Sequence, residues 1–278
     1  MILDVTLQTV WPTLRGIHRE VPRFAVIGYG KLGGKELGYA SDLDIIFLYD
    51  DDAADARDIY ARFGQRLNNW LNSLTSAGML YETDLALRPD GASGLLVSSV
   101  EAFREYQLHK AWIWEHQALT RARFSAGDAA IGGAFEAIRK EVLMQARDLV
   151  ALKAEVIAMR QKMLDGHPNH GELFDLKHDR GGIIDVEFIV QYLVLAHAPQ
   201  HAVLTANRGN VALLAQLAAL GLIEEALAQR VGEAYVEYRR LQHAIRLQGQ
   251  TKAQLAADAV AVHIAAVRSL WLQVFGSD

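Results

Sequence analysis

The sequence predicts an α+β protein, in which a small α/β domain with a mixed sheet is followed by an all-α helical bundle. Two observations carry this prediction. Short apolar runs and glycine-rich loops fall between about residues 23 and 97. After that stretch, apolar residues recur at helical spacing to the end of the sequence. We place the change of pattern near residue 125 and expect a domain at 1–125 and a helical bundle at 126–278.

Composition excludes several classes of protein. Of the 278 residues, 51% are hydrophobic and 22% are charged, which is typical of a globular protein and not of a disordered one. The absence of cysteine excludes disulfides, thiolate metal sites and a cysteine nucleophile, and it fits a reducing cytoplasm. A formal charge of −5 disfavours nucleic acid as a partner. Apolar runs are short and no signal peptide is recognisable, so we expect a cytoplasmic protein with no membrane partner.

The first elements follow from local patterns. Apolar spacing over 4–19 predicts a helix or a helix pair, interrupted at Pro12. The apolar run at 23–27 predicts a strand. A loop with five glycines follows at 28–38, and the run DLDIIFLY at 42–49 predicts a second strand.

Further elements complete the expected sheet domain. Residues 55–77 have the apolar spacing of an amphipathic helix, and Gly78 is a natural terminator. Alternation over 79–87 predicts a third strand. The turn-rich segment 88–94 separates it from a short fourth strand at 95–97.

Helical periodicity dominates the remaining sequence. It predicts helices at 100–109, 111–120, 129–145, 148–164, 182–197, 208–219, 222–248 and 259–274.

The glycine loop does not fit two common nucleotide-binding motifs. Gly28–Gly33 matches G-x-G-x-x-G, but the next strand begins nine residues after Gly33 and leaves no room for a crossover helix. The P-loop pattern fails because Tyr29 stands where a glycine is needed and Glu36 where a hydroxyl residue is needed. The motif therefore has to be interpreted together with the strand that follows it.

Two aspartates open that following strand. Asp42 and Asp44 are two residues apart, so their side chains project from the same side of a strand. Neighbouring carboxylates repel unless a cation neutralises them, and oxygen ligands suit Mg²⁺. Asp84 on the next predicted strand completes a cluster of a kind that supports in-line displacement at phosphorus. An isolated D-x-D pair is more often structural, but the preceding glycines and the later aspartate favour a functional site.

These features resemble the nucleotidyltransferase superfamily of the DNA polymerase β type. More narrowly, four segments are similar to the bacterial glutamine synthetase adenylyltransferase family. They are FAVIGYGKLGGKELGYASDLDIIFLY at 24–49, YETDLALRPDGASGLLVS at 81–98, WIWEHQALTRARF at 112–124 and FDLKHDRGGIIDVEFIVQ at 174–191. Enzymes of that family carry two homologous catalytic halves, one removing AMP and one adding it. This sequence has one set of motifs, closer to the C-terminal, AMP-adding half, so we expect part of a longer enzyme or a separately encoded domain.

The resemblance implies transfer of AMP from ATP to a tyrosine hydroxyl of glutamine synthetase, with release of pyrophosphate, in the control of nitrogen assimilation. It implies Mg²⁺ as cofactor, ATP as substrate and the PII regulatory protein as a partner of the full-length enzyme. Asp42, Asp44 and Asp84 would be the catalytic metal ligands, with Asp84 also a candidate base. The expected nucleotide contacts are Gly33, Gly34, Ser41, Arg88, Lys177 and Arg180. Asp185 and Glu187 would assist the acceptor tyrosine.

Three alternatives remain open. The chain could carry the AMP-removing activity of the same family, which needs the same cluster. It could transfer a nucleotide to a small-molecule acceptor, although the helical bundle offers the surface that recognition of a protein requires. It could also be a catalytically silent module that senses nucleotide or PII, although the intact set of aspartates weighs against this.

Overall fold

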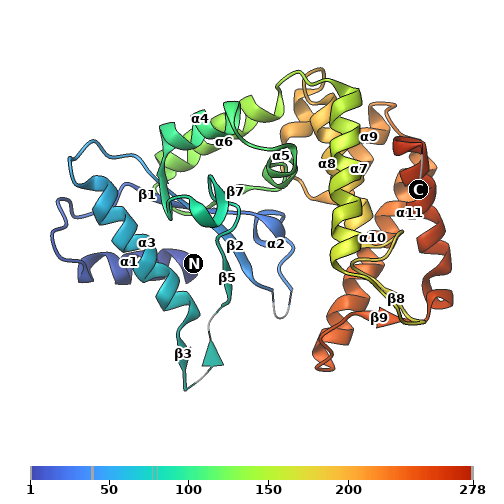
Figure 1. Cartoon of the computed structure of the whole chain (residues 1–278), viewed down its shortest axis with the longest axis horizontal. Coiled ribbons are helices and arrows are strands. Elements are labelled where there is room, and N and C mark those ends of the chain that lie inside the picture. Colours follow the sequence, from blue (N-terminus) through green and yellow to red (C-terminus); the bar gives the residue numbers. More distant parts are fainter. Residues whose placement is uncertain (1, 39–40, 77, 80, 277–278) are drawn as a thin grey trace. The chain divides into compact units, whose positions relative to one another are not determined.

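The computed structural model describes residues 2–38, 41–76, 78–79 and 81–276. Of these residues, a first compact unit contains those up to Val142 except Gly38, and a second contains Gly38 and those from Leu143 onward. The first unit contains a sheet covered by helices, and the second is almost wholly helical (Figure 1). The α+β prediction is confirmed.

A five-stranded sheet forms the centre of the first unit, with strand order β5-β2-β1-β7 and with β6 also paired to β2. β1 is antiparallel to both β2 and β7, whereas β5 and β6 run parallel to β2. The sheet is therefore mixed, as predicted. The strands are β1 (Phe24–Gly28), β2 (Leu43–Tyr49), β5 (Thr83–Asp84), β6 (Val97–Ser99) and β7 (Arg123–Gly127).

Helices cover both faces of this sheet (Figure 1). Phe24 and Val26 of β1 face the core beneath α1 and α3, while Ala25 and Ile27 face the core beneath α4, α5 and α6. Because both faces are buried, β1 is a continuous apolar run and not an alternating one. The covering helices are α1 (Ile2–Val10), α3 (Ala56–Asn72), α4 (Val100–His109), α5 (Ile113–Leu119) and α6 (Ala129–Leu143).

Several predicted elements of this unit have different bounds. The helix expected over 4–19 ends at Val10, and Pro12 lies in a short 3-10 turn, Trp11–Thr13. The helix expected over 55–77 ends at Asn72. The strand expected over 79–87 is wrong for most of its length, because only Thr83–Asp84 pairs with β2.

The segment before β5 forms a small hairpin of its own, with β3 (Leu74–Thr75) antiparallel to β4 (Gly78–Met79). After β5, the amide of Ala86 donates a hydrogen bond to Asp84 Oδ1 at 2.7 Å. This hydrogen bond between the Asp84 side chain and the backbone two residues later forms a turn that ends the strand. The alternation of side chains in the sequence does not reveal such a turn.

β7 was missed by the sequence analysis. Its residues RFSAG contain an arginine, a serine and a glycine, so no strand pattern is visible, yet the segment pairs with β1 along Ala25–Gly28. β7 spans residue 125, where the domain boundary was predicted, and the compact unit continues through α6. The division into domains at 1–125 and 126–278 remains a prediction.

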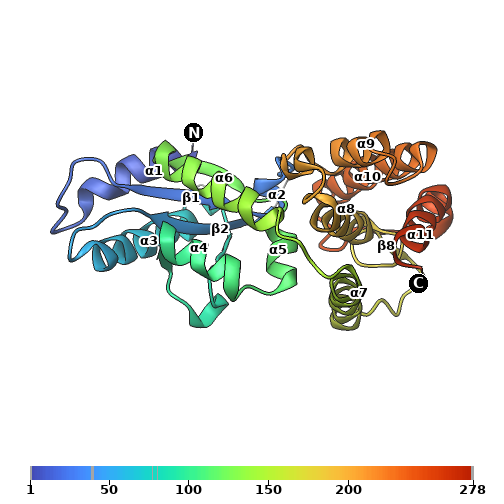
Figure 2. The same ribbon diagram turned by 90° about the horizontal axis from the view of Figure 1, so that it is seen from above.

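The second unit is a helical bundle around α8, which packs against α7, α9, α10 and α11 (Figure 2). Almost every residue of α8 is buried, which explains its apolar composition on all sides. A two-stranded sheet, β8 (Phe174–Asp175) with β9 (Gln254–Leu255), was not predicted. The helices are α7 (Leu149–Gly166), α8 (Ile183–His197), α9 (Asn210–Ala219), α10 (Glu225–Leu247) and α11 (Ala261–Phe275), with 3-10 turns at Ala202–Thr205 and Ala257–Val260.

One segment among the described residues, Ala257–Phe275, is long and apolar enough to cross a membrane by length and composition alone. The expectation from sequence considered only uninterrupted apolar runs, whereas Asp258 and Arg268 interrupt this one. The segment contributes Val267 and Leu270 to the buried interior, and α11 packs against α8 and α10. A core helix of a bundle satisfies the same criteria.

Candidate active site

Asp42 and Asp44 stand at the beginning of the central strand β2. Ile45 and Phe47 face the core beneath α1 and α3, while Ile46 faces the core beneath α6. Because side chains alternate along a strand, Asp44 shares the face of Ile46, and Asp42 precedes it on that face. Both aspartates are half-buried.

Asp84 lies beside this pair because β5 is parallel to β2, in a register that sets Asp84 opposite Asp44. β5 is anchored to α3 through Thr83. The Thr83 hydroxyl donates to Asn68 Oδ1 at 2.5 Å and accepts from Asn72 Nδ2 at 2.6 Å, and the Thr83 amide donates to Asn72 Oδ1 at 3.2 Å. This polar clamp fixes the position of the exposed Asp84 carboxylate.

The three carboxylates act on one another electrostatically. Burial raises the pKa of Asp44, and the charges of Asp42 and Asp84 raise it further. Lys31 and Arg121 oppose this effect, and the resulting pKa is about 6. Burial and the two neighbouring carboxylates therefore outweigh the two cations in their effect on Asp44.

The glycine turn approaches Asp44 closely. α2 (Gly30–Gly33) follows β1, and the Tyr29 amide just before it donates to the Asp44 carbonyl at 2.8 Å. Gly30 has a φ of 49°, and a Cβ atom there would overlap the Asp44 carboxylate. Only glycine accommodates both this conformation and this approach.

Gly33 and Gly34 have a different environment. Their amides donate within the turn, to Tyr29 O at 2.7 Å and Gly30 O at 3.0 Å. A Cβ atom on Gly33 would overlap the Arg121 carbonyl oxygen, and one on Gly34 would lie 2.7 Å from an Arg121 guanidinium nitrogen. Both glycines thus make room for Arg121, and a contact of either with nucleotide remains a prediction.

Arg121 and Lys31 are charged residues that the sequence analysis missed. The Arg121 side chain is buried and forms an ion pair with Glu36 at 2.8 Å. Both cations act on Asp44, as its pKa shows. Lys31 stands inside the glycine loop, so its position was a usable signal. Arg121 stands in the turn between α5 and β7, within the segment 112–124 that was noted only for its resemblance to a family.

Ser41 and Arg88 are the remaining predicted site residues of this unit. Ser41 is buried directly before Asp42. Arg88 donates from Nη1 to the Leu85 carbonyl at 2.7 Å and from Nη2 to the Ala92 carbonyl at 3.2 Å. Its guanidinium therefore holds its own loop together, and a role toward phosphate remains a prediction.

Lys177 and Arg180 lie in the loop between β8 and α8 of the second unit. Asp175 shapes this loop, because its Oδ1 accepts hydrogen bonds from the amides of Lys177 at 2.8 Å and His178 at 3.0 Å. The Lys177 side chain is exposed. Arg180 Nη2 donates to Gln161 Oε1 at 2.9 Å.

Asp185, predicted to assist the acceptor, is buried and internally bonded. Its Oδ1 accepts from Arg160 Nε at 2.5 Å, and its Oδ2 accepts from the Gly181 amide at 2.5 Å. Arg160 also donates from Nη2 to the His178 carbonyl at 2.7 Å, so the pair ties α7 to the loop.

Glu187 is the second predicted acceptor-side residue. The Tyr235 hydroxyl donates to its Oε1 at 3.2 Å. The structure thus brings Asp42, Asp44 and Asp84 together in the first unit and places Lys177, Arg180, Asp185 and Glu187 in the second.

No group of three or more histidine, aspartate or glutamate residues in the described part of the chain is arranged to hold a metal ion. The chemistry of the donor set still suits Mg²⁺, because Asp42, Asp44 and Asp84 offer only carboxylate oxygens. A bound Mg²⁺ at this cluster remains a prediction.

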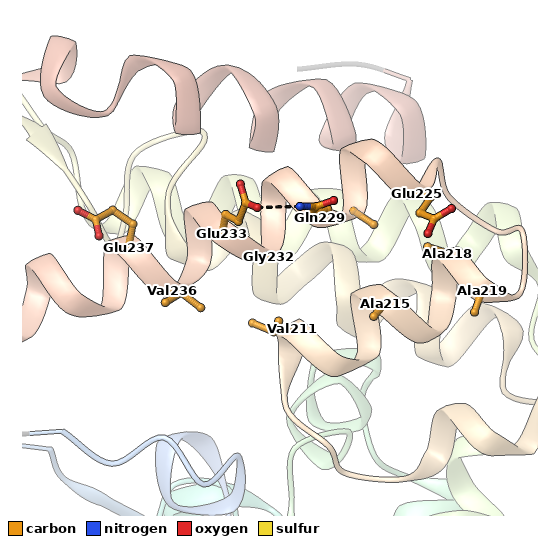
Figure 3. Close-up of a pocket in the computed structure, with 11 residues that line it drawn as sticks. Val211, Ala215, Ala218, Ala219, Glu225, Gln229, Gly232, Glu233, Val236 and Glu237 are labelled. Carbon is orange, nitrogen blue, oxygen red and sulfur yellow. Dashed lines mark hydrogen bonds between the residues drawn. The ribbon is translucent and has the colours of Figure 1, made fainter.

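A groove of about 580 Å³ lies between α9 and α10 in the second unit (Figure 3). Small and apolar side chains line it, including Val211, Ala215 and Val236, and Gln229 donates to Glu233 at 3.0 Å along it. It contains none of the predicted site residues, so it is not the candidate for nucleotide chemistry.

Comparison with known proteins gives two family matches. Residues 2–138 match the family model of glutamate-ammonia ligase adenylyltransferase. Residues 157–268 match that of PII-uridylyltransferase. The two matches cover the sheet-containing unit and the bundle separately.

Curated relatives match over almost the whole chain. All are described as bifunctional glutamine synthetase adenylyltransferase/adenylyl-removing enzymes. The protein of Aromatoleum aromaticum is 59% identical over 277 residues, covering 100% of this chain and 29% of that protein. The protein of Burkholderia mallei is 55% identical, covering 99% and 30%. The protein of Nitrosomonas europaea is 56% identical, covering 100% and 31%.

This chain thus spans about three tenths of the length of these relatives. The family resemblance inferred from the four sequence segments between residues 24 and 191 is confirmed. Residues 2–138 thus belong to the glutamate-ammonia ligase adenylyltransferase family, and the whole chain is similar to part of the bifunctional enzymes of that family.

Proposed function

We propose that this chain transfers AMP from ATP to a tyrosine hydroxyl of glutamine synthetase and releases pyrophosphate. The names of its relatives support this activity. The observation that carries the proposal is the register of Asp44 and Asp84 on adjacent strands, with Asp42 directly before β2 and near enough to raise the pKa of Asp44. Transfer at phosphorus is catalysed mainly by positioning the reactants and neutralising their charge, and a cluster of carboxylates that can hold a cation serves both purposes.

In the proposed reaction the tyrosine oxygen attacks the α-phosphorus of ATP, and the bond from that phosphorus to the pyrophosphate oxygen breaks. A tyrosine hydroxyl has a pKa of about 10, so it must lose its proton during attack. Asp84 takes this proton, since it is the exposed member of the cluster. Mg²⁺, held by Asp42, Asp44 and Asp84, would neutralise the phosphate charge when bound.

The nucleotide contacts remain proposals. We assign Gly33, Gly34, Ser41 and Arg88 of the first unit to the nucleotide, because all lie on the segments that flank the aspartates in sequence. Lys177 and Arg180 supply positive charge from the glycine-containing loop of the second unit.

Acceptor and regulatory contacts are also proposed. Asp185 and Glu187 would assist the acceptor tyrosine, Asp185 by ordering the loop whose Gly181 amide it bonds. The match of residues 157–268 to a PII-uridylyltransferase family supports regulation by PII in the full-length enzyme. We propose that the protein works in the cytoplasm, with the catalytic domain at 1–125 and the bundle at 126–278.

The test is incubation of the chain with α-labelled ATP, Mg²⁺ and unmodified glutamine synthetase. We expect label on the synthetase, at a higher rate than on its denatured chain or on a short tyrosine peptide. Asp42→Asn is the inactive control. Equal labelling of all three acceptors would favour a small acceptor. Phosphate-dependent release of label from modified synthetase, with no forward transfer, would favour the removing activity.

A further inference from the structure

A second cavity of about 320 Å³ lies entirely within the helical unit. Three segments surround it: the C-terminal end of α7 with the turn after it, the loop after β8, and the chain from the end of α10 to β9. Its volume falls in the range of sites for small molecules, which begins at about 300 Å³. Its lining is more polar than that of the groove in Figure 3.

Positive charge dominates its lining. Lys177, Arg246 and Lys252 each come from a different part of the sequence and meet around this cavity. Within the described residues none of the three forms an ion pair. Arg246 Nη1 donates to the Gln250 carbonyl at 3.3 Å, a bond that leaves its charge uncompensated. Cations gathered around a concave surface without carboxylates paired to them create a local positive potential, which attracts anions.

One carboxylate, that of Asp175, stands among the described residues of the lining. Asp175 accepts two backbone hydrogen bonds through Oδ1, and its Oδ2 lies 3.4 Å from His178 Nδ1. Desolvation alone would raise the pKa of Asp175, but these hydrogen bonds lower it to about 2. Asp175 is therefore ionised and offsets part of the positive charge, which leaves three cations against one carboxylate in the lining.

Two histidines complete the polar wall. The rings of His167 and His178 stack in parallel, with centroids 4.3 Å apart, and both line the cavity. Their ring nitrogens add hydrogen-bonding groups to those of the lysines and the arginine. A small ligand with several anionic oxygens matches this lining, since each cation can then bond a separate oxygen.

We propose that this cavity binds a diphosphate group, either as free pyrophosphate or as the terminal phosphates of a nucleotide. The choice of diphosphate among small anions rests on the proposed function, which both consumes ATP and releases pyrophosphate. Arg246 and Lys252 are the new ligands in this assignment, and they join Lys177.

The test is isothermal titration calorimetry of the full chain with pyrophosphate, in buffer containing EDTA so that no divalent cation takes part. We expect saturable binding to the unchanged chain. Arg246→Ala and Lys252→Ala should each weaken it about fivefold to tenfold, the loss expected for one charge-assisted hydrogen bond. Arg230→Ala is the matched control, because Arg230 is an exposed arginine of the same helix outside the cavity. It should leave binding unchanged.

Further arms separate the sources of the ligand. If ATP competes with pyrophosphate, the terminal phosphates of the nucleotide can occupy the cavity. If ATP does not compete, free pyrophosphate is the ligand of the cavity. AMP that binds as tightly as pyrophosphate would overturn the diphosphate assignment. Equal weakening by Arg230→Ala, or undiminished binding to the Arg246→Ala/Lys252→Ala double variant, would also overturn it.

The proposed function can fail independently of this inference. Asp42→Asn should retain pyrophosphate binding in EDTA while losing AMP transfer. An unchanged chain that transfers AMP but does not bind pyrophosphate in EDTA would refute the cavity and leave the proposed function standing. A chain that binds pyrophosphate in EDTA but transfers no AMP would refute the proposed function and leave the cavity assignment standing.

Discussion

Asp44 of β2 and Asp84 of β5 stand opposite each other on neighbouring parallel strands. Because the two strands pair over only two residues, this relationship does not follow from a long ladder of backbone hydrogen bonds. It depends on the attachment of Thr83 to Asn68 and Asn72. The carboxylate cluster is thus held by side chains as much as by the sheet.

Replacing either strand aspartate by its amide should abolish AMP transfer. We expect Asp42→Asn and Asp44→Asn to lower the rate by orders of magnitude, because each removes charge from the proposed metal ligands. The assay is transfer of labelled AMP at saturating Mg²⁺, with circular dichroism to verify folding. Near-normal activity in either variant would contradict the metal assignment.

Asp44→Asn should also be at least as stable as the unchanged chain in EDTA at pH 7.5. The raised pKa of Asp44, about 6, means that its ionised form is disfavoured in the metal-free fold. Its contribution to stability therefore falls as pH rises from its usual pKa through 6, and the amide avoids that loss. Thermal unfolding measures this, and a large drop in melting temperature would contradict it.

Gly30→Ala should disrupt the site, because the new Cβ overlaps the Asp44 carboxylate and the backbone has a positive φ. We expect a loss of stability of more than about 1 kcal/mol, together with a loss of activity. Gly133→Ala is the control, since Gly133 lies inside α6 with open space around it. That change should stabilise the fold by up to about 1 kcal/mol. Equal effects of the two substitutions on chemical denaturation would contradict the close approach.

Thr83→Val should lower the rate of transfer with a small effect on folding. The valine keeps the shape of the side chain but removes the hydroxyl that bonds Asn68 and Asn72. Asp84 then loses its fixed position, which we expect to reduce kcat about tenfold, with little change in the KM for ATP. Thr9→Val, at an exposed threonine of α1, is the control. An unchanged kcat for Thr83→Val would show that the clamp does not serve catalysis.

Stability should fall at low pH because of Asp51. Desolvation would raise the pKa of Asp51, but hydrogen bonds from His18, the Ala53 amide and the Tyr60 hydroxyl lower it to about 2. A carboxylate with a lowered pKa stabilises the fold above its unfolded pKa and loses that contribution as pH falls from about 4 to about 2. Asp51→Asn should flatten this part of the pH profile of unfolding. If Asp51→Asn leaves the pH profile of unfolding unchanged, Asp51 is not the cause of the loss of stability at low pH.

Lys177→Ala should raise the KM for ATP in AMP transfer, because the substitution removes an exposed cation assigned to the nucleotide. Steady-state kinetics with varied ATP measure this. Lys153→Ala on α7 provides a control for the loss of a lysine elsewhere in the same unit. Kinetics of Lys177→Ala that match the control would contradict the assignment.

Local sequence patterns were sufficient to predict those strands and residue pairs whose structure is determined by residues nearby in the sequence. The pair Asp42 and Asp44 was found because alternation along a strand is a local property. β1 and β2 were found because buried central strands are continuous apolar runs. The bounds of β5 were not found, because the Asp84 side chain competes for the amide of Ala86 and ends the strand.

What was missed depends on contacts between distant residues. Gly34 precedes Arg121 by most of the first unit, yet its lack of a side chain is what admits the guanidinium. β7 has few apolar residues and becomes a strand only because the free edge of β1 provides hydrogen bonds for it. Spacing along a single sequence carries no information on such pairs.

The buried ion pair of Arg160 and Asp185 has a kinetic consequence. Arg160 bonds the His178 carbonyl, and Asp185 bonds the Gly181 amide, so the loop that carries Lys177 is ordered before any ligand arrives. A preorganised loop loses little conformational entropy on binding. Anion capture at this loop should therefore be limited by diffusion, with association rates that depend on ionic strength and not on a slow closing step.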